Sequence, residues 1–488
     1  MKLKYIIQNL DIISMTADPE TDISGICYDS RKTEKDNIFV AIRGLSSDGH
    51  AFISSAVKKG ASVIVCEEAY ESDAPYVLVK DSRLALALIS ASWFDFPAKK
   101  MHVIGVTGTS GKTTTTHLIR HVLQTILHEK VGMIGTNGNY IGDEYIHTDF
   151  TTPDSFELQN LFYKMYNSGC SYVVMEVSSH SLALERVAGV QFDVAAFTNL
   201  SQDHLDFHNT MEEYARAKKK IFSMCSGACI NLDDPYSSYM IEGIKCPTLT
   251  TSALGKQADL TAEDIFLSEN GVSFSACFKN MKTEVKLSIP GMFSVHNALT
   301  ALSVCIMSGN ELKSVADALS SAKGVKGRAE TVPVDKDYTV IIDYSHKPDA
   351  LENILKTLRP VTKGRLIALF GCGGDRDREK RPIMGKVAAK NADVVVVTSD
   401  NPRTERPEDI INEIVAGMKD EETEYHIIVD RIEAIHWALD NAVRGDVILL
   451  AGKGHEDYQI VGHEKHHMDE REIVAEYLKE KDRVWVLD

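Results

Sequence analysis

The stretch VIGVTGTSGKTTTTHLIR, residues 103–120, decides the fold of this chain. An apolar run leads into glycines, a lysine and threonines, which is typical of a strand, a phosphate-binding loop and a helix. Gly108 and Gly111 let backbone N–H groups turn towards an anion at the positive end of the helix. Lys112 is placed to neutralise the β- and γ-phosphates, and Thr113 to bind Mg²⁺. The GxxxxGK[ST] spacing fails by one residue, so the loop alone predicts only ATP or GTP binding, against a plain glycine-rich turn.

The composition bounds the class of protein. The chain has 488 residues, 44% hydrophobic and 25% charged, with a formal net charge of -17. This length predicts about three domains, and the negative charge argues against general binding to nucleic acid or an anionic membrane. Nine cysteines without a CxxC pair indicate reduced thiols. With neither a convincing signal peptide nor a membrane-spanning apolar run, we expect a cytoplasmic protein without membrane insertion.

Strand-like runs alternate with helical patterns in three segments, residues 1–98, 99–328 and 329–488. This alternation predicts an α/β fold of three domains: a smaller amino-terminal α/β domain, a central P-loop-type domain with a mainly parallel sheet, and a doubly wound carboxyl-terminal domain. The expected strands include 37–42, 62–68, 76–80, 102–106, 172–179, 193–201, 339–345, 365–371, 393–400 and 446–454, and expected helices end near 61 and cover 83–94.

Two candidate metal ligands follow strand-like runs of the central segment. Glu176 lies in MEVSSH and His204 in NLSQDHLDFH. Both side chains could ligate a divalent ion beside the phosphates. Taken singly, the glutamate is more often a cap and the histidine an ordinary loop residue. Their position downstream of a phosphate loop favours the metal site.

Short motifs occur in order over essentially the whole chain. They are TGTSGKTTT (107–115), TTPD (151–154), MEVSSHSL (175–182), NLSQDHLDFH (199–208), YARAK (214–218), PGMFSVHNAL (290–299), KGRAE (326–330), DYSHKPD (343–349), GCGGDRDREKRP (371–382), SDNPR (399–403) and GKGHEDYQ (452–459). Each motif is modest alone, but as an ordered set they are specific. The chain resembles the Mur ligases. This resemblance implies an amino-terminal domain that grips UDP, a central ATPase-like domain and a Rossmann-like carboxyl-terminal domain that brings an amino acid.

The resemblance also implies a reaction. It is the ATP- and Mg²⁺-dependent ligation of meso-diaminopimelate to the D-Glu carboxylate of UDP-N-acetylmuramoyl-L-Ala-D-Glu, through an acyl phosphate, in cytoplasmic peptidoglycan precursor synthesis. An acyl phosphate is needed because a carboxylate is a poor acyl donor, and the protein positions reactants and offsets negative charge. We expect a monomer. L-lysine as the added amino acid, a folylpolyglutamate synthetase-like ligase and a P-loop regulatory switch are the alternatives. The amino-terminal segment that carries YDSRK argues against a folylpolyglutamate synthetase-like ligase. The lack of an NKxD motif argues against a GTPase switch.

The nucleotide and metal residues follow from the family motifs. The resemblance implies catalytic roles for Lys112, Lys218 and His204; ATP binding by Thr107, Gly108, Thr109, Ser110, Gly111, Lys112, Thr113, Thr114, Asn297, Arg328 and Asp343; and metal binding by Thr113, Glu176, His204 and Lys218. In the family the last of these is carbamylated, which turns a cation into an anion that supports Mg²⁺. Because carbamylation requires a neutral amine, we expect burial, or the cations at Lys219 and Lys220, to depress its pKa. Domain closure is expected to bring Arg328 and Asp343 to the nucleotide.

The remaining substrate residues are assigned in the same way. Serine at position 294 and leucine at 184 replace the family's asparagine and glutamine, so no role is carried over to them. The resemblance places Ser30 at the uridine and Thr151, Thr152, Ser178 and Arg186 around the muramoyl peptide. It places Arg381, Asp400, Asn401, Pro402, Arg403, Gly452 and Glu456 at diaminopimelate. DNPR is the family's diaminopimelate signature. Only diaminopimelate, and not lysine, offers Arg403 a distal carboxylate for paired hydrogen bonds.

Overall fold

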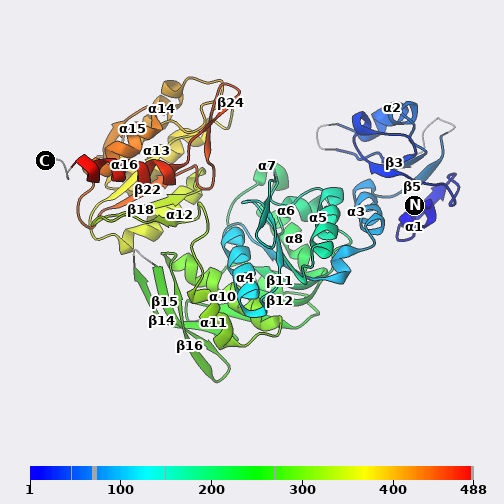
Figure 1. The fold of residues 1–488 in the computed structure, drawn as a ribbon, viewed down its shortest axis with the longest axis horizontal. Helices are drawn as coiled ribbons and strands as arrows, with labels where there is room; N and C mark the ends of the chain where they lie inside the picture. The colour runs from blue at the N-terminus through cyan, green and yellow to red at the C-terminus, as the bar shows by residue number, and fades with distance from the viewer. Residues whose placement is uncertain (45–46, 69–73, 149, 269–270, 485–488) are drawn as a thin grey trace. The chain divides into compact units, whose positions relative to one another are not determined.

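The computed structural model describes residues 1–44, 47–68, 74–148, 150–268 and 271–484. Its residues fall into two compact units. Figure 1 labels the helices and strands. The first comprises Met1–Leu260 and Thr300–Val315, and the second Thr261–Leu299 and Ala316–Asp488. The domain boundaries expected after residues 98 and 328 stay predictions.

The first unit begins with a five-stranded sheet in the order β1-β5-β4-β3-β2. Its strands run parallel except β1, which pairs antiparallel with β5. Apolar residues alternate along the strands between two clusters, one packed with α1 and α3 and the other with α2, so both faces are buried. The elements are α1 Leu3–Ile7, β1 Ile12–Met15, β2 Gly25–Cys27, β3 Asn37–Val40, α2 Ile53–Lys58, β4 Val63–Cys66, β5 Tyr76–Val79 and α3 Ser82–Trp93.

A larger sheet follows, with strands of the first unit in the order β13-β12-β11-β6-β10-β7-β8-β9. From β13 to β7 neighbouring strands run parallel, and β8 and β9 add antiparallel strands at the edge. The elements are β6 His102–Thr107, α4 Lys112–Leu127, β7 Val131–Ile134, β8 Asn139–Ile141, β9 Glu144–Ile146, α5 Ser155–Asn167, β10 Tyr172–Glu176, α6 Ser179–Ala183, β11 Phe192–Phe197, α7 Leu205–His208, α8 Met211–Lys219, β12 Cys225–Asn231, α9 Ser237–Ile241 and β13 Thr248–Ser252. Because the strands are parallel, the loops that follow β6, β10 and β11 leave the same edge.

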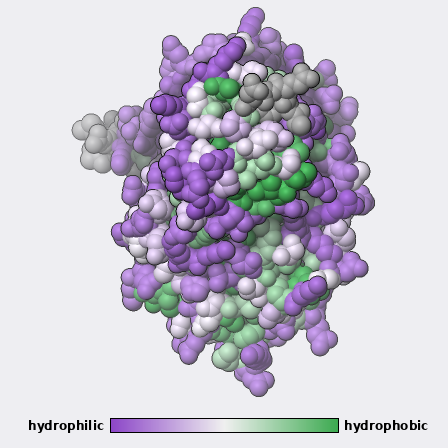
Figure 2. Space-filling model, turned by 90° about the vertical axis from the view of Figure 1, so that its right-hand side faces the viewer, coloured by the Kyte–Doolittle hydropathy of each residue, from purple (hydrophilic) through white to green (hydrophobic). Residues whose placement is uncertain are grey.

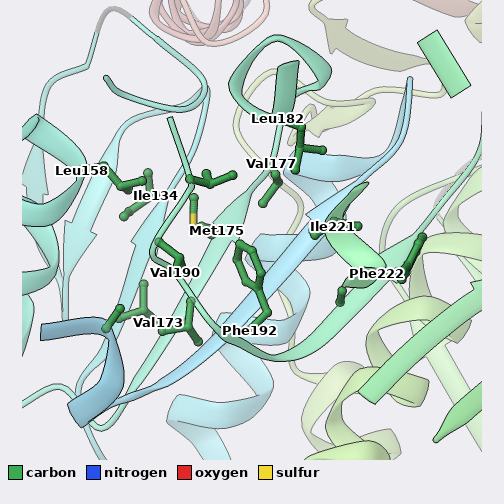
Figure 3. Close-up of a cluster of buried hydrophobic side chains, with 14 of the residues drawn as sticks. Ile134, Leu158, Val173, Met175, Val177, Leu182, Val190, Phe192, Ile221 and Phe222 are labelled. Carbon is green, nitrogen blue, oxygen red and sulfur yellow. The ribbon is translucent and has the colours of Figure 1, made fainter. Parts of the chain in front are cut away.

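Apolar side chains of this sheet pack with side chains of the helices and segments that connect its strands. Figure 3 shows side chains from β7, β10 and β11 packed with those of α5 and the segments around α6 and α8. The labelled members are Ile134, Leu158, Val173, Met175, Val177, Leu182, Val190, Phe192, Ile221 and Phe222. A close-packed layer of this kind holds the strand ends rigidly.

The second unit contains a six-stranded sheet in the order β17-β18-β22-β19-β20-β21. It is parallel except for the antiparallel pair β17 and β18. An apolar cluster joins it to α15 and α16, while α12, α13 and α14 pack side by side. The elements from residue 260 onwards are β14 Leu260–Ser268, β15 Gly271–Phe278, β16 Met281–Leu287, α10 Met292–Met307, α11 Leu312–Ser320, β17 Glu330–Val332, β18 Thr339–Asp343, α12 Pro348–Leu358, β19 Leu366–Phe370, α13 Lys380–Asn391, β20 Val394–Val397, α14 Pro407–Ala416, β21 Glu424–Ile427, α15 Arg431–Asn441, β22 Val447–Ala451, β23 Tyr458–Val461, β24 Glu464–His467 and α16 Glu470–Val484. The helices α10 and α11 each contain residues of both units.

The predicted α/β class is confirmed, because mainly parallel strands alternate with helices along the chain. Several strands are shorter than expected: those predicted at 172–179, 193–201 and 446–454 end at Glu176, Phe197 and Ala451. The apolar residues pair in the sheet, whereas the polar residues after them turn away into loops, and those loops carry the predicted site residues.

The surface in Figure 2 is mostly hydrophilic, with apolar residues gathered in smaller areas. Across the described part of the chain, every helix is too short or too polar to cross a bilayer.

Candidate active site

The phosphate loop joins β6 to α4 and is braced by the end of β11. Gly108 and Gly111 have φ angles of +151° and +82°, which favour glycine. A Cβ atom on Gly108 would overlap Thr198 Oγ1. The same hydroxyl donates to the Ser110 carbonyl at 2.7 Å, and Asn199 Oδ1 accepts from the Ser110 N–H at 2.9 Å. The brace therefore holds the loop in one shape.

Other residues of the loop are tied to the same edge. Thr107 is buried at the end of β6, where its hydroxyl donates to the Val177 carbonyl at 2.9 Å. Thr109 lies 3.1 Å from the Tyr214 hydroxyl, measured between oxygens. Thr114 is buried in the first turn of α4. Lys112 Nζ donates back to the carbonyls of Gly108 and Thr109 at 2.8 and 2.9 Å, so its charge lies against the loop.

Glu176 reaches the start of α4 from the end of β10. Its side chain is buried, and Oε2 accepts from the Thr113 hydroxyl at 3.0 Å. Thr136, which follows β7, donates its backbone N–H to Oε1 at 2.8 Å and its hydroxyl to Oε2 at 3.2 Å. Thr136 was not among the predicted site residues; its position just after a parallel strand was the available signal. A hydroxyl and a carboxylate oxygen side by side at a phosphate loop fit the oxygen ligands that Mg²⁺ prefers.

Lys218 lies beneath the phosphate loop. It is 1% exposed, and Nζ donates to the Gly108 carbonyl at 2.7 Å. Burial, and then the charge of Lys112, hold the pKa of this amine well below its ordinary value. The expected depression of the Lys218 pKa is confirmed. The prediction that Lys219 and Lys220 cause it was wrong, because these two lysines pair with Glu242 and Glu185.

His204 lies among aromatic rings. It is the N-cap residue of α7, with a left-handed φ of +54°, and its Nε2 is 3.3 Å from Asp203 Oδ2. Its ring centre is 4.8 Å from that of His180, whose pKa is lowered by burial. Over residues 1–44, 47–68, 74–148, 150–268 and 271–484, no three His, Cys, Asp or Glu side chains lie close enough together to hold a metal ion. The metal roles of Glu176 and His204 therefore stay predictions.

The residues predicted around the muramoyl peptide form a connected group near Glu176. The Thr151 and Thr136 hydroxyl oxygens are 2.9 Å apart, and the Thr152 hydroxyl donates to the Glu176 carbonyl at 2.9 Å. Ser178 N–H donates to Thr152 Oγ1 at 3.1 Å, and the Ser178 hydroxyl caps α6. The structure therefore brings the three predicted residues together at the end of β10.

Arg186 connects this group to a cavity of about 210 Å³ within the first unit. Its Nη1 donates to the Thr152 carbonyl at 3.1 Å, and Nε lies 2.6 Å from Asp154 Oδ1. The cavity is lined by Tyr28, Ile42, Arg83, Leu86, Asp154, Ser155, Leu184 and Arg186. Ser30 lies two residues after Tyr28, in a short 3₁₀ turn capped by Asp29. Its uridine contact stays a prediction.

Three residues predicted at the nucleotide belong to the second unit. Asp343 ends β18, accepts from the Ala329 N–H at 2.8 Å and pairs with the Ser345 hydroxyl. Desolvation raises the pKa of its carboxyl group. The Arg328 guanidinium lies 5.1 Å from the Tyr344 ring centre, and Asn297 is buried in α10. Their contacts with ATP stay predictions.

The predicted amino-acid residues meet at the carboxyl ends of β20 and β22. Asp400, Asn401 and Pro402 are buried. Arg403 has a left-handed φ of +51°, and Nη1 donates to the Gly374 carbonyl at 2.9 Å. A non-glycine residue held in this region indicates a locally strained loop, as is common at binding sites.

Gly452 and Glu456 complete this group from the segment after β22. Gly452 has a φ of +111°, and a Cβ atom on it would come within 2.8 Å of Asp400 Oδ2. Glu456 Oε2 accepts from Asn401 Nδ2 at 3.0 Å. Lys453, which was not among the predicted site residues, is fully buried beside both Asn401 and Glu456.

Arg381 is placed differently from a ligand-facing residue. It is 0% exposed, and its guanidinium forms paired bonds with Glu405 at 2.8 and 2.9 Å and a bond with Glu413 at 2.9 Å. It also donates to the Gly373 carbonyl at 3.3 Å. The structure shows this arginine supporting the neighbouring loop, and its contact with the amino acid stays a prediction.

Comparison with known proteins agrees with this arrangement. Three family profiles match: "Mur ligase family, catalytic domain" over residues 22–93, "Mur ligase middle domain" over 106–305 and "Mur ligase, glutamate ligase domain" over 327–454. The UDP-N-acetylmuramoyl-L-alanyl-D-glutamate–2,6-diaminopimelate ligase of Caldanaerobacter subterraneus subsp. tengcongensis is 49% identical over 95% of this chain and 96% of its own. The Clostridium acetobutylicum relative named as ligase 1 of the same kind is 46% identical over 98% and 100%.

A solved structure of a ligase with the same printed name superposes with a TM-score of 0.74, at 32% identity, over 99% of both chains. The fold and the site define an enzyme with a phosphate loop at the strand ends of one sheet and a group of buried polar side chains at the strand ends of another. The chain belongs to the Mur ligase family, whose members are ATP-dependent enzymes that form amide bonds. The resemblance inferred from the motifs and the predicted three-domain architecture are thereby confirmed.

Proposed function

We propose that this enzyme ligates meso-diaminopimelate to the D-Glu carboxylate of UDP-N-acetylmuramoyl-L-Ala-D-Glu with ATP, as the names of its relatives describe for them. The observation that carries the proposal is the DNPR loop in the second unit. Arg403 lies there at a strand end beside buried Asp400 and Asn401. A planar guanidinium at this place suits the distal carboxylate that diaminopimelate has and L-lysine lacks. We further propose that the enzyme is a cytoplasmic monomer.

The first unit would activate the carboxylate. Lys112 and the N–H groups at the start of α4 would offset the charge of the γ-phosphoryl group during its transfer to the D-Glu carboxylate. Thr113 and Glu176 would hold Mg²⁺, which screens the phosphate oxygens. Lys218 as a carbamate, together with His204, would support a second ion.

The second unit would supply the nucleophile. An amine attacks the acyl phosphate only as the neutral base, so it must lose a proton and be aligned with the carbonyl carbon. Fixing the far end of diaminopimelate through Arg403 leaves the reacting amine fewer orientations. The product is an amide, with ADP and phosphate released.

Release of ADP tests the proposal. Rapid ADP formation should require both the sugar peptide and diaminopimelate, and radiolabelled diaminopimelate should enter the product in preference to L-lysine. Equal use of L-lysine would contradict the amino-acid assignment. Rapid ADP formation in the absence of both the sugar peptide and diaminopimelate would instead indicate a P-loop switch.

A further inference from the structure

Lys453 is a buried lysine for which the reaction described above has no role. It follows β22 in the segment GKGHEDYQ, and its side chain is 0% exposed. Removing an ammonium group from water is costly unless partners compensate its charge and hydrogen bonds. The partners of Lys453 therefore indicate what it does.

Its partners are two residues predicted to meet the amino acid. Lys453 Nζ donates to Asn401 Oδ1 at 2.8 Å and to Glu456 Oε2 at 2.9 Å. Asn401 Nδ2 donates to the same Glu456 oxygen at 3.0 Å. The three side chains form a closed triangle of hydrogen bonds within the second unit.

The triangle determines the orientation of the Asn401 amide. Oδ1 also accepts from the Ile460 N–H at 2.9 Å. Turning the amide over would place its NH₂ group against two donors, the ammonium of Lys453 and the backbone N–H of Ile460.

We propose that Lys453 is a positioning residue of the amino-acid site. It holds the Asn401 amide and the Glu456 carboxylate in place by hydrogen bonds, so that both present fixed polar atoms to an amino-acid ligand. This inference rests on the proposed function, because it takes Asn401 and Glu456 as residues that meet the amino acid.

Kinetics of Lys453→Met test the inference, with Lys419→Met as the matched control because Lys419 is exposed. Loss of a supporting partner of this kind should raise KM for diaminopimelate by about 10-fold or more while KM for ATP stays unchanged. Thermal unfolding of both variants separates this effect from loss of structure. A lysine with only a structural role would lower Tm without changing the ratio of KM for diaminopimelate to KM for ATP.

A double-mutant cycle separates action through Glu456 from general damage. If Lys453 acts through this carboxylate, Lys453→Met should add little to the KM of Glu456→Gln. Should Lys453→Met fail to fold, the double variant still tests the inference, because it no longer buries an unpaired carboxylate. The proposal would be overturned if the effects of Lys453→Met and Glu456→Gln on KM for diaminopimelate were independent and additive. It would also be overturned if KM of Lys453→Met stayed within about twofold of the control.

The wild type distinguishes this failure from that of the proposed function. If the wild type adds L-lysine instead, the substrate assignment fails and the same comparison is made with L-lysine. If it adds neither amino acid, a crystal structure of Lys453→Met decides: a displaced Asn401 or Glu456 side chain supports the inference, and unchanged positions of both side chains overturn it.

Discussion

Lys218 illustrates at the residue scale how one buried amine couples stability to chemistry. The amine is expected to carry its proton in the unfolded chain, whereas burial and Lys112 depress its pKa in the folded protein. The unfolded state therefore binds more protons, and stability rises with pH up to the unfolded pKa. In CO₂-depleted buffer, where Lys218 is the free amine, we expect Lys218→Met to have a higher Tm than the wild type near neutral pH and a weaker pH dependence of Tm. Its kcat should fall about 100-fold or more. Thermal unfolding at several pH values and steady-state kinetics check both.

Lys219→Met is the matched control, because Lys219 pairs with Glu242 instead. It should leave kcat nearly unchanged. A short-chain carboxylate should partly restore Lys218→Ala if a carbamate is the active form. An intact-mass measurement that shows unmodified Lys218 in active, metal-loaded enzyme would contradict the carbamate.

Arg403 carries the second residue-scale prediction. Arg403→Ala should raise KM for diaminopimelate about 10- to 100-fold, since a charge-assisted hydrogen-bonded pair is lost, and should leave KM for ATP unchanged. Arg403→Lys should recover only part of this loss, because lysine keeps the charge without the planar fork. Arg444→Ala, at an exposed position, is the control. Unaltered amino-acid kinetics in Arg403→Ala would discard the specificity assignment.

At the scale of elements, the loop between β6 and α4 depends on the end of β11. Gly108→Ala should abolish most ATP binding, because its Cβ would overlap Thr198 and its φ of +151° is unfavourable for alanine. Gly169→Ala is the control, since it also has a positive φ but nothing within 4 Å. Nucleotide binding measured by calorimetry should separate the two variants. Equal affinities would contradict a loop held by its brace.

A second element-scale prediction concerns the strand ends of the second unit. Arg431 of α15 is 1% exposed, pairs with Glu470 of α16 at 2.8 Å and donates to the carbonyls of Ser399 and Ala451 at 3.3 and 2.9 Å. Arg431→Met should cost about 3–5 kcal/mol, because it leaves a buried carboxylate unpaired. Denaturant unfolding measures this loss. Adding Glu470→Gln should restore part of it, and full additivity of the two losses would contradict the pairing.

At the scale of the whole molecule, the chain has two compact units, of which the first holds the phosphate loop and the second holds the residues predicted at diaminopimelate. A ligand stabilises the part that binds it, by about 2.7 kcal/mol at 100 times its Kd. We expect ATP with Mg²⁺ to raise the unfolding temperature of the first unit, and diaminopimelate that of the second. Calorimetry with each ligand, and with EDTA to remove the metal, checks this. If diaminopimelate raised the unfolding temperature of Arg403→Ala as much as that of the wild type, the assignment of Arg403 to diaminopimelate would be contradicted.

The sequence predicted much of the fold and part of the site. The phosphate loop, the strand order along the chain and the strand-end position of Glu176 follow from local patterns of apolar and glycine residues. Several strands were predicted to extend too far at their carboxyl ends, because the polar residues that follow a strand look like its continuation. Lys453 was missed because a lysine between two glycines gives no local sign of burial.

The ordered motifs by themselves determined the family, the phosphate loop and the DNPR segment, because each rests on neighbours close in sequence. Only the tertiary structure decided that Lys218 lies against Gly108, 110 positions away, and that burial depresses its pKa. Likewise, only the folded chain turns the Arg381 guanidinium towards Glu405 and Glu413. Burial and charge pairing depend on residues distant in sequence, so local patterns do not contain them.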